Sequence, residues 1–231
     1  MNSKTLDELL HDREAKRPVA LVSQLTKDRQ WLIYPDEPPP DDLGPGLIAA
    51  ARAALEADRC ELVEDSGESY FLQSFNPPLR MIIVGAVHIA QALAEMARLA
   101  AFDVIVVDPR EAFATEARFP GIRLAKQWPD RALEDLALDR GSAVVTLSHD
   151  PKIDDPALAS ALASPAFYIG ALGSRKTHRA RLERLGARGF GDEDGQRIRG
   201  PVGLSIGSRT AAEIAVSILA QVIEARRGAG A

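Results

Sequence analysis

Short runs of consecutive apolar residues alternate with amphipathic segments of helical period from Leu79 to the C-terminus. Such runs are typical of strands covered on both faces of a parallel sheet, and the amphipathic segments predict crossover helices. The pattern therefore predicts an α/β fold, a Rossmann-like parallel sheet with helices on both faces. The expected strands are Met81–Gly85, Phe102–Val107, Ser142–Leu147 and Ala166–Ile169, and the clearest helices are Ile89–Leu99 and Thr210–Arg226.

Residues 1–78 follow another pattern, in which short strands and helices are separated by polar and proline-rich stretches. We expect helices at Thr5–Lys16 and Gly46–Asp58, strands at Pro18–Leu25 and Gln30–Tyr34, and a hairpin of Cys60–Asp65 with Tyr70–Phe75. The segment Asn76-Pro77-Pro78 predicts a stiff, extended link. The chain is thus expected to hold two domains, a small truncated α+β region at 1–78 and the Rossmann-like domain at 79–231.

Composition narrows the functional class. The formal net charge of −5 argues against nucleic-acid binding, which normally needs a basic surplus or stripe. The polar N-terminus lacks a signal peptide and no apolar run approaches the ~20 residues that cross a bilayer, so we expect a cytoplasmic protein without membrane contact. The single cysteine, Cys60, excludes an intramolecular disulfide, and its place in an expected strand favours a buried, unreactive thiol.

The turn after the first strand of the second domain partly matches a dinucleotide fingerprint. Its residues are Gly85, Ala86, Val87 and His88, followed by Ala90 at the sixth position. Val87 stands where a glycine usually lets the backbone approach a pyrophosphate, while the helix N-terminus still offers free N–H groups to an anion. The turn is good evidence for the fold and moderate evidence for a bound dinucleotide.

An acidic residue ends the second strand at the spacing of a ribose ligand. Asp108 lies 108 − 85 = 23 residues after Gly85, close to the separation of about 20 that is typical of a ribose contact. The alternative is a capping aspartate in the turn before Pro109. Arg110, two residues on, either contacts a phosphate or is solvated.

Two further loops follow later strands, at the sheet edge where parallel sheets bind ligands. His149 in the first is a candidate ligand contact. The neighbouring Asp150, Asp154 and Asp155 either meet a magnesium ion or, as we favour, cap a helix that begins near Pro156. The second loop offers another anion cradle ahead of a strongly basic helix, and its candidate residues are Gly170, Gly173, Ser174 and Arg175.

No catalytic centre is evident in the sequence. It has no serine in a nucleophile elbow with an acid and a histidine in order, and no P-loop motif. Near the C-terminus, the pattern T-x-x-E at Thr210 and Glu213 predicts a capping box at the start of the last helix.

Four blocks, taken in order, resemble the XdhC/CoxI family of xanthine dehydrogenase accessory proteins. They are VGAVHIAQALA with VVDPR, TLSHD, YIGALGSRKTH, and GPVGLSIGSRTAAEIAVSILAQV, and the resemblance covers about residues 70–227. The resemblance implies a chaperone that binds molybdenum cofactor, molybdopterin or its cytosine dinucleotide form, and delivers it to a molybdenum hydroxylase such as xanthine dehydrogenase or carbon monoxide dehydrogenase. It implies a carrier more than an enzyme.

The chain also departs from the family pattern. Val87 replaces a family glycine, Ser205 replaces an aspartate, and residues 1–78 lack the family's N-terminal cysteine motif. We therefore hypothesise a small companion protein that supplies the cysteine module in trans, and the exposed sheet edges of the small region favour a homodimer. The alternative functions are an NAD(P)-binding oxidoreductase or redox sensor, and a scaffold that binds no nucleotide.

Overall fold

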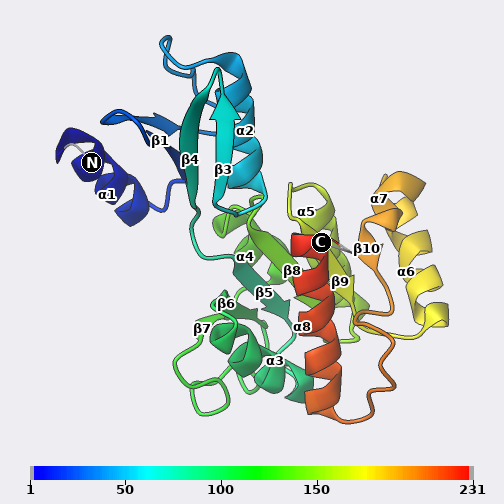
Figure 1. The fold of residues 1–231 in the computed structure, drawn as a ribbon. Helices are drawn as coiled ribbons and strands as arrows, with labels where there is room; N and C mark the ends of the chain where they lie inside the picture. The colour runs from blue at the N-terminus through cyan, green and yellow to red at the C-terminus, as the bar shows by residue number, and fades with distance from the viewer. Residues whose placement is uncertain (1–2, 229–231) are drawn as a thin grey trace. The chain divides into compact units, whose positions relative to one another are not determined.

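The computed structural model describes residues 3–228, which fold as two compact units divided between Pro77 and Pro78. The first unit is a four-stranded antiparallel sheet in the order β2-β1-β4-β3 with a helix on each face (Figure 1). Alternating apolar residues of β1 explain this arrangement, since Ala20 and Val22 pack against α2 while Val19 and Leu21 pack against Leu9 of α1. The elements are α1 (Ser3–Glu14), β1 (Val19–Gln24), β2 (Arg29–Ile33), α2 (Pro45–Glu56), β3 (Glu61–Asp65) and β4 (Glu68–Phe75).

The predicted hairpin is present, and Asp65 pairs with Glu68 across the two-residue turn. Ser66 and Gly67 both have positive φ, 53° and 79°, which is the geometry of the turns that best fit the twist of antiparallel strands. The expectation for Cys60 is wrong, because this cysteine is exposed and lies before β3 rather than inside it. It belongs to the connection from α2 to an edge strand, where few residues are covered.

The second unit contains a six-stranded parallel sheet in the order β10-β9-β8-β5-β6-β7. Numbered from β5 as the first strand, this is the order 6-5-4-1-2-3 of a dinucleotide-binding Rossmann sheet. The predicted fold class is confirmed. The strands are β5 (Arg80–Val84), β6 (Asp103–Val107), β7 (Arg123–Ala125), β8 (Ser142–Thr146), β9 (Tyr168–Ala171) and β10 (Ile198–Arg199).

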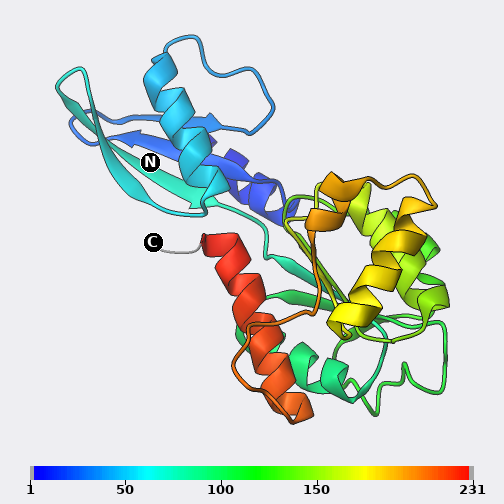
Figure 2. The same ribbon diagram turned by 90° about the vertical axis from the view of Figure 1, so that its right-hand side faces the viewer.

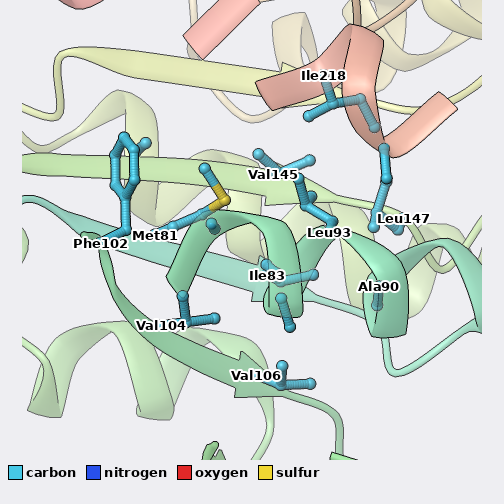
Figure 3. Close-up of a cluster of buried hydrophobic side chains, with 14 of the residues drawn as sticks. Met81, Ile83, Ala90, Leu93, Phe102, Val104, Val106, Val145, Leu147 and Ile218 are labelled. Atoms are coloured by element: carbon cyan, nitrogen blue, oxygen red, sulfur yellow. The ribbon is translucent and has the colours of Figure 1, made fainter. Parts of the chain in front are cut away.

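Helices cover both faces of this sheet, as Figure 2 shows. One face packs against α3 (His88–Leu99) and α8 (Ala211–Arg227), where Met81, Ile83 and Val145 meet Leu93 and Ile218 (Figure 3). The other face packs against α4 (Pro129–Asp135), α5 (Pro151–Leu162) and α6 (Arg175–Gly186), and the short α7 (Asp192–Gln196) precedes β10. Within residues 3–228 none of the helices is long and apolar enough to span a bilayer.

Three differences from the expected elements have local causes. The short edge strands β7 and β10 carry too few residues to show a period, and β9 begins two residues later than expected. Helix α5 begins at Pro151 and not near Pro156, because Asp150 caps it by accepting the N–H of Lys152 at 2.9 Å. Pro151 then occupies the first turn, where its missing N–H costs nothing, and Pro156 is tolerated inside the helix.

Candidate functional site

The carboxyl ends of β5 and β8 lie side by side at the point where the strand order reverses, which is where Rossmann sheets bind ligands. Gly85 ends β5 with φ +103°, and a Cβ there would lie 2.7 Å from the backbone nitrogen of Ser148. A glycine is therefore required for the loops after β5 and β8 to meet. The structure thus brings the fingerprint turn and the His149 loop together, as expected of one site.

The turn from β5 into α3 is partly committed to internal bonds. The N–H of Ala86 donates to Asp108 Oδ2 at 2.7 Å, and the N–H of Val87 donates to the carbonyl of Gly85 at 2.9 Å. Val87 is the N-cap of α3 and makes no side-chain cap bond, so the first-turn N–H groups from the exposed His88 onward remain available to an anion.

Asp108 is buried and fully engaged with protein donors. Oδ1 accepts the backbone N–H and Nε of Arg110, both at 2.9 Å, and Oδ2 accepts Arg110 Nη2 and the Ala86 N–H, both at 2.7 Å. Because a carboxylate has about four lone-pair positions, a ribose hydroxyl would have to displace one of these donors. Burial alone would raise the pKa of Asp108, but the hydrogen bonds from Arg110 and Ala86 outweigh it and hold that pKa below its ordinary value.

The loop after β8 presents His149 to solvent in a strained conformation. Its φ is +63°, which few residues other than glycine adopt, and such strain is often found at ligand sites. Each of the three aspartates has a different partner. Asp150 caps α5, Asp154 accepts the Ser148 hydroxyl at 2.6 Å, and Asp155 pairs with Arg184. Across residues 3–228 no group of three His, Cys, Asp or Glu side chains could hold a metal ion.

The turn from β9 into α6 has two differently placed glycines. Gly170 is buried within β9, and a Cβ there would lie 2.6 Å from Val202 Cγ2 and 2.8 Å from the Tyr168 ring, so its role is close packing. Gly173 has φ +143°, and Ser174 caps α6 by accepting the N–H of Thr177 at 3.1 Å. With the exposed Arg175 in the first turn, this turn has the glycine, the cap and the helix start that the predicted anion cradle requires.

One residue of this region escaped the sequence reasoning. Arg181 is one of several basic residues of this helix and was not among the predicted site residues, yet it is only 2% exposed. The apolar residue at the next turn of the same face, Leu185, is the only signal in the sequence that this part of the helix faces the core.

Two cavities of the described residues lie away from this edge. One of about 500 Å³ lies between α1 and β2, and one of about 460 Å³ lies beside α6 and α7, and neither is lined by the predicted site residues. The candidate site is therefore defined by its polar groups and by its place at the sheet edge.

Comparison with known proteins identifies the second unit. The family model of the XdhC Rossmann domain matches residues 81–222, a segment that contains the strands of this unit from Met81 onward and the first part of α8, as far as Val222. The chain belongs to the XdhC family. The matched segment also contains all the loops of the candidate site described above.

Two relatives of known name are similar over about two thirds of the chain. The molybdenum cofactor insertion chaperone PaoD of Escherichia coli is 33% identical over 156 residues, which cover 68% of this chain and 43% of PaoD. A probable xanthine dehydrogenase subunit of Bacillus subtilis is 32% identical over 164 residues, covering 71% of this chain and 48% of that protein. This member of the XdhC family spans less than half the length of the curated relatives that it matches.

A solved structure shares the fold. The crystal structure of a xanthine dehydrogenase from Bacillus halodurans superimposes with a TM-score of 0.74, covering 97% of this chain and 67% of that chain. The two sequences are 24% identical, so this similarity shows only that the two proteins share a fold.

Proposed function

We propose that this chain binds molybdenum cofactor and serves in its insertion into a molybdenum hydroxylase of the xanthine dehydrogenase type. The observation that carries the proposal is the match of the XdhC Rossmann domain to residues 81–222, which include the whole ligand-binding edge of the sheet. The name of PaoD, a molybdenum cofactor insertion chaperone, supports the same role for its relative. In this role the protein is a carrier located with its target enzyme in the cytoplasm.

The residues at the switch point fit a cofactor of this kind. The dinucleotide form of molybdopterin contains a pyrophosphate and a ribose, and the sheet edge offers two helix N-termini that can receive an anion. Candidates to hold it are Gly85, His88, Arg110, His149 and the turn Gly173–Arg175. The bound group supplies the redox chemistry of the target enzyme, while this chain's residues hold and orient it.

Binding by the isolated protein is the direct test. Under anaerobic conditions the full chain is titrated with molybdopterin cytosine dinucleotide, with molybdopterin, and with NAD and NADP in parallel. We expect selective binding of a pterin form. A preference for NAD or NADP would contradict the proposal in favour of an oxidoreductase or redox sensor, and binding of none of the four ligands would favour a scaffold.

A matched pair of histidine variants tests whether the sheet edge is the site. His149→Ala removes the side chain exposed beside the switch point, and His11→Ala removes an exposed histidine of α1 in the other unit. We expect weaker pterin binding in the first variant and unchanged binding in the second. Equal affinity of both variants and the unaltered chain would place the site elsewhere.

The role in cofactor insertion is tested in cells that lack this protein. The target hydroxylase should accumulate with little molybdenum and little activity, and the unaltered chain should restore both. Full molybdenum content of the hydroxylase without this chain would contradict the insertion role, whatever the outcome of the binding experiments.

A further inference from the structure

The buried guanidinium of Arg181 lies inside the second unit with incomplete hydrogen bonding. Its Nη2 donates to the carbonyl of Leu172 at 2.8 Å. Within the part of the chain that the structure describes, Nε and Nη1 of Arg181 are buried and have no hydrogen-bond partner. Since arginine keeps its charge in proteins, this is a cation placed in the interior with the N–H donors of two nitrogens unused.

No carboxylate among the described residues forms a salt bridge with this charge. Asp155 is committed to Arg184, whose Nε and Nη2 lie 2.6 Å and 2.9 Å from its oxygens. Asp154 accepts the hydroxyl of Ser148 at 2.6 Å. Burial lowers the pKa of Arg181, although the charges of Asp154 and Asp155 oppose this shift.

The guanidinium points toward the N-terminal end of its own helix, under the turn from β9 into α6. It binds the carbonyl of Leu172, and a Cβ on Gly173 would lie 3.7 Å from its Nη2. Above it are the free N–H groups of the first turn of α6 and the hydroxyls of Ser174 and Thr177, whose oxygens are 3.0 Å apart. The helix N-terminus and the buried cation therefore both attract an anion that binds at this turn.

The turn from β5 into α3 has the opposite charge beneath it. There the carboxylate of Asp108 binds the N–H of Ala86, so one donor of the turn is used and a negative charge lies next to it, compensated by Arg110. The half-buried Val87 also lies at this turn, where a glycine usually lets the backbone approach a phosphate. Of the two helix N-termini at this edge, only that of α6 has beneath it a buried cation that forms no salt bridge with the described residues.

We propose that the phosphate group of the ligand binds at the β9–α6 turn, over Arg181, and not at the β5–α3 turn that the dinucleotide fingerprint indicates. Arg181 acts there as a positioning residue, because it holds the carbonyl of Leu172 and adds its field to the cradle. The identity of the ligand as a pterin dinucleotide rests on the proposed function, whereas the preference for a phosphate oxyanion can be tested without the cofactor.

A pair of N-cap variants distinguishes the two turns. Ser174 is the N-cap of α6 and Val87 is the N-cap of α3, and aspartate is a good N-cap residue at either position. Each substitution therefore adds one negative charge at the mouth of one cradle while the helix keeps its start. The full chain and both variants are titrated with pyrophosphate by calorimetry at low ionic strength, where screening is weakest.

Ser174→Asp should weaken pyrophosphate binding by about tenfold or more, and Val87→Asp should change it by less than about twofold, because only the first charge lies where the anion binds. The reverse order, or no binding of pyrophosphate to the unaltered chain, would overturn the inference.

A second pair of variants tests the buried cation itself. Arg181→Met removes the buried charge at similar volume, and Arg179→Met removes an exposed charge of the same helix. Arg181→Met should lose about tenfold in pyrophosphate affinity without a lower unfolding temperature for the free protein, since a buried unpaired charge contributes no stability. Arg179→Met should lose less than about twofold. If Arg181→Met keeps its pyrophosphate affinity and unfolds at a lower temperature, Arg181 has only a structural role.

Failure of this inference and failure of the proposed function give different results. If Ser174→Asp abolishes pyrophosphate binding and the unaltered chain ignores the pterin dinucleotide, the phosphate site stands and the proposed function fails. If the dinucleotide binds the unaltered chain and Ser174→Asp equally well, the proposed function stands and the phosphate site is elsewhere.

Discussion

Replacing Gly85 by alanine tests the packing that creates the switch point. The residue has φ +103°, and the added Cβ would lie 2.7 Å from the backbone nitrogen of Ser148 and 2.9 Å from its Cα and Cβ. These contacts are with backbone and with the first side-chain atom, which cannot rotate away. The loops after β5 and β8 would have to separate, and the candidate site would change shape with them.

The expected loss has two parts. Holding a non-glycine residue in this region of φ costs about 1–3 kcal/mol, and forcing a methyl group into a packed contact costs about 1–3 kcal/mol more. The free energy of unfolding should therefore fall by about 2–6 kcal/mol. For a domain of this size that corresponds to a melting temperature roughly 5–20 °C lower.

Gly207→Ala is the matched control, because Gly207 also has positive φ, +75°, but an added Cβ there meets nothing within 4 Å. Urea unfolding of both variants is followed by circular dichroism on the full chain. Gly207→Ala should lose only the conformational part, about 1 kcal/mol. If Gly85→Ala loses no more than Gly207→Ala, the contact with Ser148 does not limit this position and the reasoning is refuted.

Three other predictions concern particular side chains. Asp108→Asn should lower the unfolding free energy by about 3 kcal/mol at pH 7, because it leaves Arg110 without its buried partner. Folding depresses the pKa of Asp108 below its ordinary value of 3.8. The difference in unfolding free energy is therefore present above pH 3.8 and should shrink as the pH falls through the folded pKa. A difference that grows in acid would contradict the assignment. Thr210→Ala should cost about 1 kcal/mol in urea unfolding by removing the cap of α8, and Thr210→Ser should recover most of it. Cys60 should react fully with a thiol reagent in the native state, and Cys60→Ser should change stability by less than about 0.5 kcal/mol, whereas a protected thiol would contradict its exposure.

Local signals in the sequence were sufficient for most elements. The continuous apolar runs of β5, β6 and β8 predict a parallel sheet because residues covered on both faces leave no polar alternation. The capping box at Thr210 and Glu213 is present as predicted, with both reciprocal bonds. These features depend on residues close together in the chain, so a pattern can reveal them.

The charges of the candidate site depend on contacts between distant segments, and the sequence could not reveal them. The sequence leaves Asp108 as either a ribose ligand or a capping aspartate, and only the structure shows its four hydrogen bonds with Ala86 and Arg110. The sequence predicts that Cys60 lies in a strand, whereas the structure places it between the end of α2 and the edge strand β3. In each case the residue type was noticed and only its environment was missing.

By itself the sequence determined the Rossmann-like domain, its resemblance to the XdhC family and the loops that carry the candidate residues. Tertiary structure alone decided which charges lie beneath those loops. Arg181 is one of several basic residues in its helix, and helical spacing cannot tell which of them is buried. That choice is made when α6 packs against α5 and the sheet, because burial depends on the neighbouring elements and not on the order of residues in the chain.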